Sequence, residues 1–166
     1  MMVQLIGRLF LLIGGTAGGF FAAGELCARQ SFLSAMERAA GRMRGEIGDL
    51  GTPLPELLGQ LSGDEKAGFF FRLAAEKEVG SREIAWNRAA EAAKEKYRLH
   101  DADVQALRML GEGLGCYGLE DQLRRLAAAE REIARRANAA AESREKHEKL
   151  LRFGGFAVGA VAALLL

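Results

Sequence analysis

The chain is poor in the residues that cross-link or interrupt a fold. Its 166 residues include only two cysteines, Cys27 and Cys116, which are too few for a disulfide framework. We expect both to be free thiols in a reducing compartment. The two prolines stand close together at positions 53 and 55, and no Pro-rich or Ser-rich stretch marks a linker. The length therefore suits one domain of ordinary size.

Histidine is equally scarce, which argues against a metal site. His100 and His147 lie far apart in the chain, and neither has a second ligand four residues away on one helical face. Around His100 we predict a helix boundary, with Asp101 as the N-cap and with His100 and Asp103 in solvent.

Motifs for catalysis or cofactor binding are also missing. The glycine-rich stretch 111–115 lacks the lysine of a phosphate-binding loop and follows a predicted helix, so we interpret it as a helix break. There is no GxSxG nucleophile motif, and Cys116 has no evident basic partner. We predict that the chain is not an enzyme and has no catalytic residue, cofactor, metal or small-molecule substrate. A membrane-tethered hydrolase would need clustered acids or histidines.

Charge is missing from both ends of the chain. Residues 1–28 hold only Arg8 and Glu25, and residues 153–166 hold no charged residue. Between these ends acids and bases alternate, and the net charge is +1. Because binding to phosphate backbones needs a concentrated basic face, no nucleic-acid partner is expected.

The first apolar run predicts a transmembrane helix over residues 3–24. From Val3 to Ala23 only Gln4, Arg8 and Thr16 are polar. A helix of this length reaches about 31 Å, which matches the hydrocarbon core of a bilayer. The alternative is an exported envelope protein with a cleaved signal peptide and a C-terminal membrane anchor, although a small-x-small cleavage pattern is poorly developed here.

The second apolar run predicts a transmembrane helix over residues 150–166. A helix of this length reaches about 25 Å, so Arg152 must extend to the headgroups or the bilayer must thin. A buried core helix is the competing interpretation, but such a helix would carry a polar face, and this run has none.

Both apolar runs carry glycines at helical spacing. Gly14 and Gly18 lie four residues apart in the first run, as do Gly155 and Gly159 in the second. Small residues at this spacing let helices approach closely in lipid, so we predict that these four glycines pack transmembrane helices together, within the chain or in a homo-oligomer. Lipid-facing glycines without a partner are an equal alternative for either run alone.

Basic residues follow the first run and precede the second. They are Arg29, Arg38, Arg42 and Arg44, then Arg144, Lys146, Lys149 and Arg152. By the positive-inside rule, the polar middle of the chain lies in the cytosol, both termini lie outside, and the protein is in the cell membrane.

The polar region, residues 25–149, predicts an all-α fold: a cytosolic antiparallel helical bundle between the two transmembrane helices. No alternating strand pattern is present. The expected helices are 28–47, a short one capped by Thr52 with Pro53 first, 64–78 capped by Asp64, 81–99 capped by Ser81, 101–110 capped by Asp101, and a last helix from Leu119 into the membrane. The first and last helices should lie antiparallel and adjacent because they leave the same membrane surface.

Apolar periodicity predicts the core of this bundle. The expected inward residues are Phe32, Met36, Ala39, Ala40, Met43 and Ile47, then Ile84, Ala85, Trp86 and Ala89, then Val104, Leu107, Met109 and Leu110, and finally Leu119, Leu123, Leu126, Ile133, Ala137 and Ala140. Phe69, Phe70 and Phe71 cannot all share one helical face, so at least one should contact a loop, the membrane or a partner.

Several pieces of the chain resemble the stage III sporulation protein AB family of endospore-forming bacteria. They are Thr52-Pro53-Leu54-Pro55-Glu56 after Glu46-Ile47, Ala85-Trp86, Leu114-Gly115 followed by Gln122, and the stretch from His147 to Gly155. The likeness covers nearly the whole chain. One departure is Tyr117-Gly118, where the family usually has a Ser-Asp pair suited to capping the last helix.

This resemblance implies a function that the residues alone do not. The family belongs to the channel, or feeding-tube, complex between mother cell and forespore, and its cytosolic domain is similar to the helical domain of type II secretion and type IV pilus platform proteins. The implied role is a non-enzymatic platform subunit in the mother-cell membrane around the forespore. The implied partners are other stage III sporulation A proteins, including the AA protein, a cytosolic secretion-type ATPase docked on the bundle.

Overall fold

Every secondary-structure element in the described part of the chain is a helix. The computed structural model describes residues 2–76, 81–112, 114–115 and 118–164, with side chains described from residue 24 to residue 147 within those ranges. The elements are α1 (Met2–Gly45), the π-helix η1 (Glu46–Leu50), α2 (Leu54–Leu61), α3 (Gly68–Ala74), α4 (Arg82–Tyr97), α5 (Asp101–Gly111) and α6 (Leu119–Leu164). The predicted all-α class is confirmed.

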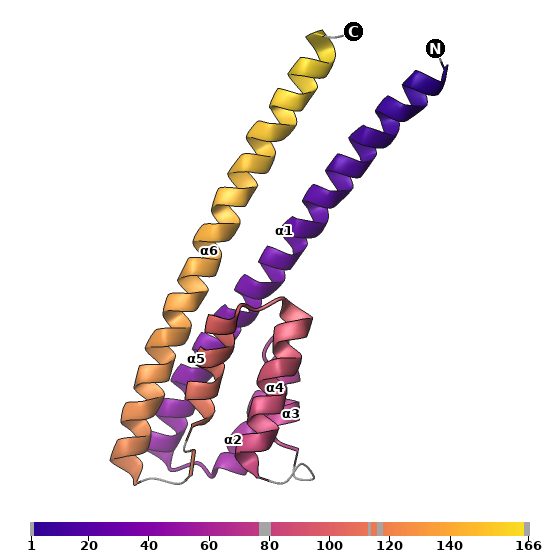
Figure 1. The fold of residues 1–166 in the computed structure, drawn as a ribbon. Helices are drawn as coiled ribbons and strands as arrows, with labels where there is room; N and C mark the ends of the chain where they lie inside the picture. The colour runs from indigo at the N-terminus through magenta and orange to yellow at the C-terminus, as the bar shows by residue number, and fades with distance from the viewer. Residues whose placement is uncertain (1, 77–80, 113, 116–117, 165–166) are drawn as a thin grey trace.

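The two long helices α1 and α6 form the frame of the fold. They lie side by side and antiparallel, and they contact each other more extensively than any other two elements do (Figure 1). The short helices α2–α5 gather at one end of this pair, with α3 on α4, α4 beside α5, and α5 against α6. The expected adjacency of the first and last helices is therefore confirmed.

The predicted transmembrane segments, residues 3–24 and 150–166, fall almost wholly on residues whose side chains are not described. Within the described residues, no helix combines the length and the hydropathy that crossing a bilayer requires. Gly14, Gly18, Gly155 and Gly159 likewise lie outside the residues whose side chains are described. Both the crossing and the packing role of these glycines stay predictions.

The core lies where the α1–α6 pair meets the short helices. α1 buries the face that its periodicity predicts. In the Phe69–Phe71 run, Phe70 and Phe71 are buried and Phe69 is the residue that turns outward. Phe69 is half-buried, with Lys96 Nζ 3.8 Å from its ring centre. The largest fully buried side chains are Trp86, Phe32, Phe70, Phe71, Leu33, Met36, Met43, Leu57, Leu107, Leu110, Leu126 and Ile133.

The end of α1 differs from the prediction at Thr52. Gly51 has a φ of 64°, the left-handed conformation that glycine adopts at little cost, and it closes η1. The Thr52 hydroxyl donates to Glu46 Oε2 over 2.8 Å. Thr52 therefore bonds to the preceding helix η1 instead of capping α2. The N-cap position of α2 belongs to Pro53, without a side-chain cap.

The other predicted caps have mixed outcomes. Ser81 caps α4, since its hydroxyl accepts from the backbone N–H of Ile84. Asp64 accepts two backbone N–H bonds, but these close a turn before α3 begins. α3 also ends at Ala74, short of the predicted residue 78, because the Glu76 N–H turns back to the Leu73 carbonyl.

Three residues expected in the core are exposed. Ile84 is 54% exposed, Met109 is 41% exposed and Leu119 is 55% exposed. The buried stripe of α4 runs through alanines and Trp86 instead, which turns Ile84 to the opposite face. Leu119 is the first residue of α6 and precedes the point where that helix meets its neighbours.

Candidate functional site

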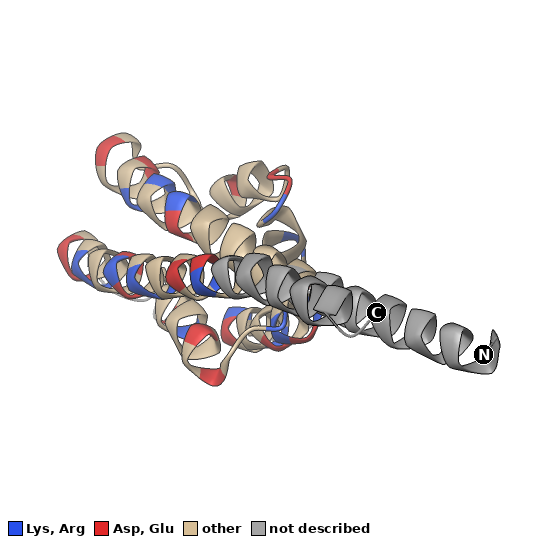
Figure 2. Ribbon diagram, turned by 90° about the horizontal axis from the view of Figure 1, so that it is seen from above, with Lys and Arg blue, Asp and Glu red and all other residues tan. Residues whose placement is uncertain are grey.

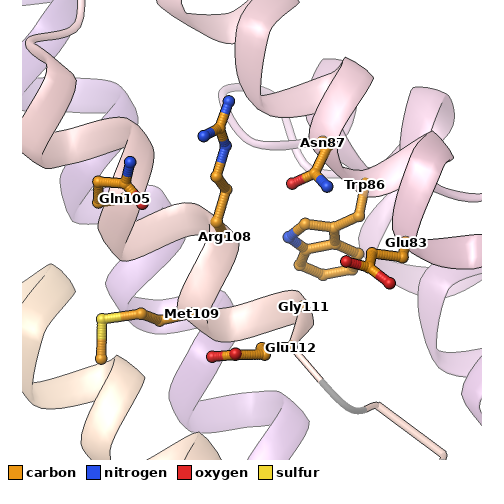
Figure 3. Close-up of a pocket in the computed structure, with 8 residues that line it drawn as sticks. All are labelled: Glu83, Trp86, Asn87, Gln105, Arg108, Met109, Gly111 and Glu112. Atoms are coloured by element: carbon orange, nitrogen blue, oxygen red, sulfur yellow. The ribbon is translucent and has the colours of Figure 1, made fainter.

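A groove between α4 and α5 gathers polar side chains from both helices (Figure 3). Its volume is about 260 Å³. The lining residues are Glu83, Trp86 and Asn87 from α4, Gln105, Arg108, Met109 and Gly111 from α5, and Glu112 directly after α5. The groove therefore lies where the start of α4 passes the last turns of α5.

Helical spacing explains why these residues meet. Arg108 and Met109 lie three and four positions after Gln105, which places these three residues on one face of α5. Glu112 follows directly as the C-cap residue of this helix. That face is opposite the one that buries Leu107 and Leu110 in the core. The groove is thus the solvent side of a helix whose other side is held by packing.

Trp86 forms the wall between the groove and the core. It is 2% exposed, and its indole Nε1–H donates to the Leu107 carbonyl over 2.7 Å. Its ring meets Phe70 edge to face, with ring centres 5.0 Å apart. A buried indole needs an acceptor, and here a carbonyl of α5 supplies it, so this bond also fixes α4 against α5.

Gly111 makes the close approach of α4 and α5 possible. A Cβ atom at this position would lie 2.4 Å from the Trp86 ring, far inside van der Waals contact. The interpretation of the stretch 111–115 as a helix break is confirmed, because α5 ends at Gly111 and Glu112 has an extended backbone. Only glycine fits at position 111 without a shift, because the Trp86 indole occupies the space that a Cβ atom would need.

The charges in the groove are only partly paired. Arg108 Nη2 donates to Glu91 Oε1 over 2.6 Å, while Arg108 Nε is buried and has no hydrogen-bond partner. In the described part of the chain, no hydrogen bond or ion pair engages the side chains of Glu83, Asn87, Gln105 and Glu112. Figure 3 shows Glu83 and Asn87 on one side of the opening and Gln105 and Arg108 on the other.

The lining residues provide binding groups but no reactive set. Two carboxylates, two carboxamides and one guanidinium can form hydrogen bonds and ion pairs with a polar ligand. Among the described residues, no three His, Cys, Asp or Glu side chains are grouped so that they could hold a metal ion. The arrangement therefore suits recognition of another molecule.

A second polar feature, a buried ion pair, ties α1 to α5. Arg29 Nε donates to Asp103 Oδ2 over 2.7 Å, and Arg29 Nη2 donates to Asp103 Oδ1 over 3.0 Å. The two residues are 6% and 1% exposed. Asp103 Oδ2 also accepts from the backbone N–H of His100. Each carboxylate oxygen is thus satisfied, as a buried charge requires.

This ion pair was not predicted from the sequence. The predictions that Asp103 lies in solvent and that Asp101 is the cap are both wrong, because Asp103 is buried and His100 occupies the N-cap position of α5. An acid three residues after a helix start is a known sign of a carboxylate that reaches back to the N-cap N–H. No local signal, however, points to Arg29, which is distant in sequence.

The remaining predicted positions are scattered. Cys27 is a half-buried free thiol, and Cys116 lies outside the described residues. His100 and His147 are both exposed, on α5's N-terminal side and on α6. In the view of Figure 2, acidic and basic residues alternate along the described helices and neither sign forms a continuous face.

Comparison with known proteins gives one consistent match. The family described as stage III sporulation protein AB matches residues 4–166. The chain is also similar to a curated protein named stage III sporulation protein AB from Bacillus subtilis (strain 168), with 24% identity over 170 residues, which is 99% of each chain. No solved structure matches this chain.

Proposed function

Because this chain belongs to the stage III sporulation protein AB family, whose role is in sporulation, we propose that it is a non-enzymatic membrane platform subunit of the channel between mother cell and forespore. In this proposal it resides in the mother-cell membrane around the forespore, with its bundle in the cytosol. It self-associates and binds other stage III sporulation A proteins, and the bundle docks the AA ATPase.

The arrangement of α1 and α6 is the observation that carries this proposal. The two helices leave the bundle at the same end, and α2–α5 gather at the other end (Figure 1). The apolar runs of the sequence belong to the first of these ends, and the charged residues belong to the second. Such a molecule has one end suited to lipid and one end suited to a cytosolic partner.

The internal ties of the bundle support a platform role. The buried Arg29–Asp103 pair connects α1 to α5, which are distant in sequence, and the Trp86–Leu107 bond connects the consecutive helices α4 and α5. A docking subunit has to hold its surface in a fixed position relative to the membrane, and satisfied buried polar contacts favour one arrangement of the helices.

Co-purification tests the docking partner. The full-length chain carries an affinity tag and is extracted in mild detergent from cells that produce the AA ATPase of the same organism. We expect the ATPase to remain bound in stoichiometric amount. A tagged membrane protein of unrelated family serves as the control, and failure of the ATPase to co-purify above that control contradicts docking.

Topology is tested in intact cells. Protease added outside should leave residues 25–149 whole if the bundle is cytosolic, and should digest them if the chain is exported. Sequencing the mature N-terminus separates the same two readings, because a start at Met1 or Met2 keeps the first membrane segment and a start near residue 24 means cleavage.

A further inference from the structure

We propose that the groove between α4 and α5 binds a protein segment that presents a Lys or Arg beside an apolar side chain. This inference rests on the proposed docking function, and it names the surface and the chemistry of the partner. The supporting features are the unpaired carboxylates, a buried donor without an acceptor, and exposed apolar side chains at the groove.

The charge of the groove favours a cation. Arg108, the positive residue of the lining, is already engaged by Glu91 over 2.6 Å. Glu83 and Glu112 have no ion pair within the described structure, so their carboxylates leave the lining net negative. A Lys or Arg side chain of a partner would pair with these acids through charge-assisted hydrogen bonds.

Arg108 indicates a second property of the bound segment, a hydrogen-bond acceptor. Its Nε–H is buried and lacks an acceptor, and such a donor is costly to leave unsatisfied. When the Arg108 side chain turns toward the groove, this N–H becomes accessible, and a main-chain carbonyl of a bound segment would accept from it. Asn87 and Gln105 flank this position and carry carboxamides that can both donate and accept, which is what an extended main chain needs (Figure 3).

Apolar side chains next to the groove indicate a third property of the bound segment, an aliphatic side chain beside its cation. Met109 lines the groove and is 41% exposed, and Ile84 is 54% exposed. Ile84 lies three residues before Asn87, so both share one face of α4. Methionine adapts its shape to what it contacts, so it suits an aliphatic side chain next to the partner's cation.

The size of the groove limits the occupant to a short segment. Its volume of about 260 Å³ lies below the range of about 300–1,000 Å³ typical of sites for drug-sized ligands. It can hold one long side chain with part of its backbone. A protein segment that continues along the surface fits this shape better than a metabolite that must be enclosed.

Trp86 provides a local readout because it is the only tryptophan of the chain and lines the groove. The full-length protein in detergent is titrated with the dipeptide acetyl-Leu-Arg-amide while the indole N–H resonance of Trp86 is followed. We expect a saturable shift. The uncharged acetyl-Leu-citrulline-amide should bind about tenfold more weakly, and acetyl-Leu-Glu-amide should give no saturable shift.

Variants assign the binding to the two acids. The double change Glu83→Gln and Glu112→Gln should weaken binding of the arginine dipeptide about tenfold. The matched control is Glu95→Gln with Glu142→Gln, two exposed acids outside the groove on α4 and α6. This control should bind the dipeptide as the unchanged chain does, and both variants should keep the Trp86 resonance of the folded state.

The outcomes separate this inference from the platform proposal. Equal binding of the arginine and citrulline dipeptides, preference for the glutamate dipeptide, or an absent shift overturns the groove assignment even if the ATPase co-purifies. If the arginine dipeptide binds as expected and the ATPase does not co-purify, the groove stands and the docking of that ATPase is rejected. If the ATPase co-purifies, the double glutamine variant should retain less of it than the control variant.

Discussion

Trp86 and Gly111 show how a residue without a side chain can fix the position of a large one. The indole lies where a Cβ on Gly111 would be, 2.4 Å from the ring atoms. Replacing Gly111 with alanine must therefore move the ring or the end of α5. Because Trp86 also bonds to Leu107 and packs on Phe70, the shift would disturb contacts on both sides of the wall.

We predict that Gly111→Ala lowers the free energy of unfolding by about 1–3 kcal/mol, the usual cost of forcing extra volume into a packed site. The measurement is chemical denaturation of the full-length chain in detergent, followed by Trp86 fluorescence. Gly59→Ala in α2 is the control, since a Cβ there meets no atom within 4 Å, and helix propensity should give a gain of up to about 1 kcal/mol. Equal stability of both variants would contradict the packing argument.

The Arg29–Asp103 pair is the other decisive contact at this scale. We predict that Arg29→Met lowers the free energy of unfolding by about 3–5 kcal/mol, because it leaves the Asp103 carboxylate buried and unpaired. Adding Asp103→Asn removes that charge and should recover much of the loss. Denaturation curves of the single and double variants measure this coupling.

Arg98 serves as the comparison for Arg29. Its side chain is 66% exposed and pairs with Glu25 over 3.1 Å. Arg98→Met should cost less than about 1 kcal/mol, as solvent-exposed ion pairs do. A double Arg29–Asp103 variant no more stable than Arg29→Met alone would mean that the buried charge is not the cause.

Individual residues were predictable where the signal is local. Ser81 caps α4 as expected, because the cap and the N–H that it binds lie three residues apart. Asp103 was misplaced because its decisive partner, Arg29, is on another helix. The four groove side chains that lack partners could not be recognised for the same reason, since a sequence does not say which faces meet.

At the scale of elements, the last turn of α4 shows how aromatic packing and ionisation are linked. The Tyr97 ring stacks on Phe32 of α1, with ring centres 4.3 Å apart, and its hydroxyl donates to the Lys66 carbonyl before α3. Burial raises the pKa of the Tyr97 phenol above its ordinary value. The folded state therefore holds this proton more tightly than the unfolded state does.

The resulting pH dependence has a definite sign. The contribution of Tyr97 is fully present below the unfolded pKa of about 10. It is lost as the pH rises through the higher pKa of the folded state. We predict that stability falls in this alkaline range and that Tyr97→Phe falls less steeply. Thermal unfolding of both chains at a series of pH values measures the difference, and parallel curves would contradict it.

Helices were predicted more reliably than their ends and faces. The existence of α4, α5 and α6 follows from apolar periodicity and caps, while the early end of α3 depends on a turn that no sequence pattern announced. Ile84 and Met109 were expected inside because they are apolar. The alanines of α4 take the buried positions instead, since they allow neighbouring helices to approach closely.

At the scale of the whole molecule, adjacency of α1 and α6 was predictable and the groove was not. The adjacency was predicted from the charge distribution, on the premise that both segments leave the same membrane surface. The groove requires the packing of α4 on α5, which depends on Gly111 and Trp86.

The glycines of the apolar runs belong to this scale. We predict that Gly14→Leu with Gly18→Leu weakens self-association in a membrane two-hybrid assay, because large side chains keep helix backbones apart in lipid. Gly24→Leu is a control with no atom within 4 Å of its Cβ position. An unchanged signal in the double variant would reject the packing role.

α6 is unbroken from Leu119 to Leu164, so the whole helix keeps one rotational phase. Each residue of an α-helix turns the next by about 100°. Inserting one residue after Ala140 would therefore swing everything beyond it to a different side, whereas inserting seven would nearly restore the original direction. The rotation of the bundle about the α6 axis is therefore fixed relative to the C-terminal end of the same helix by the number of residues between them.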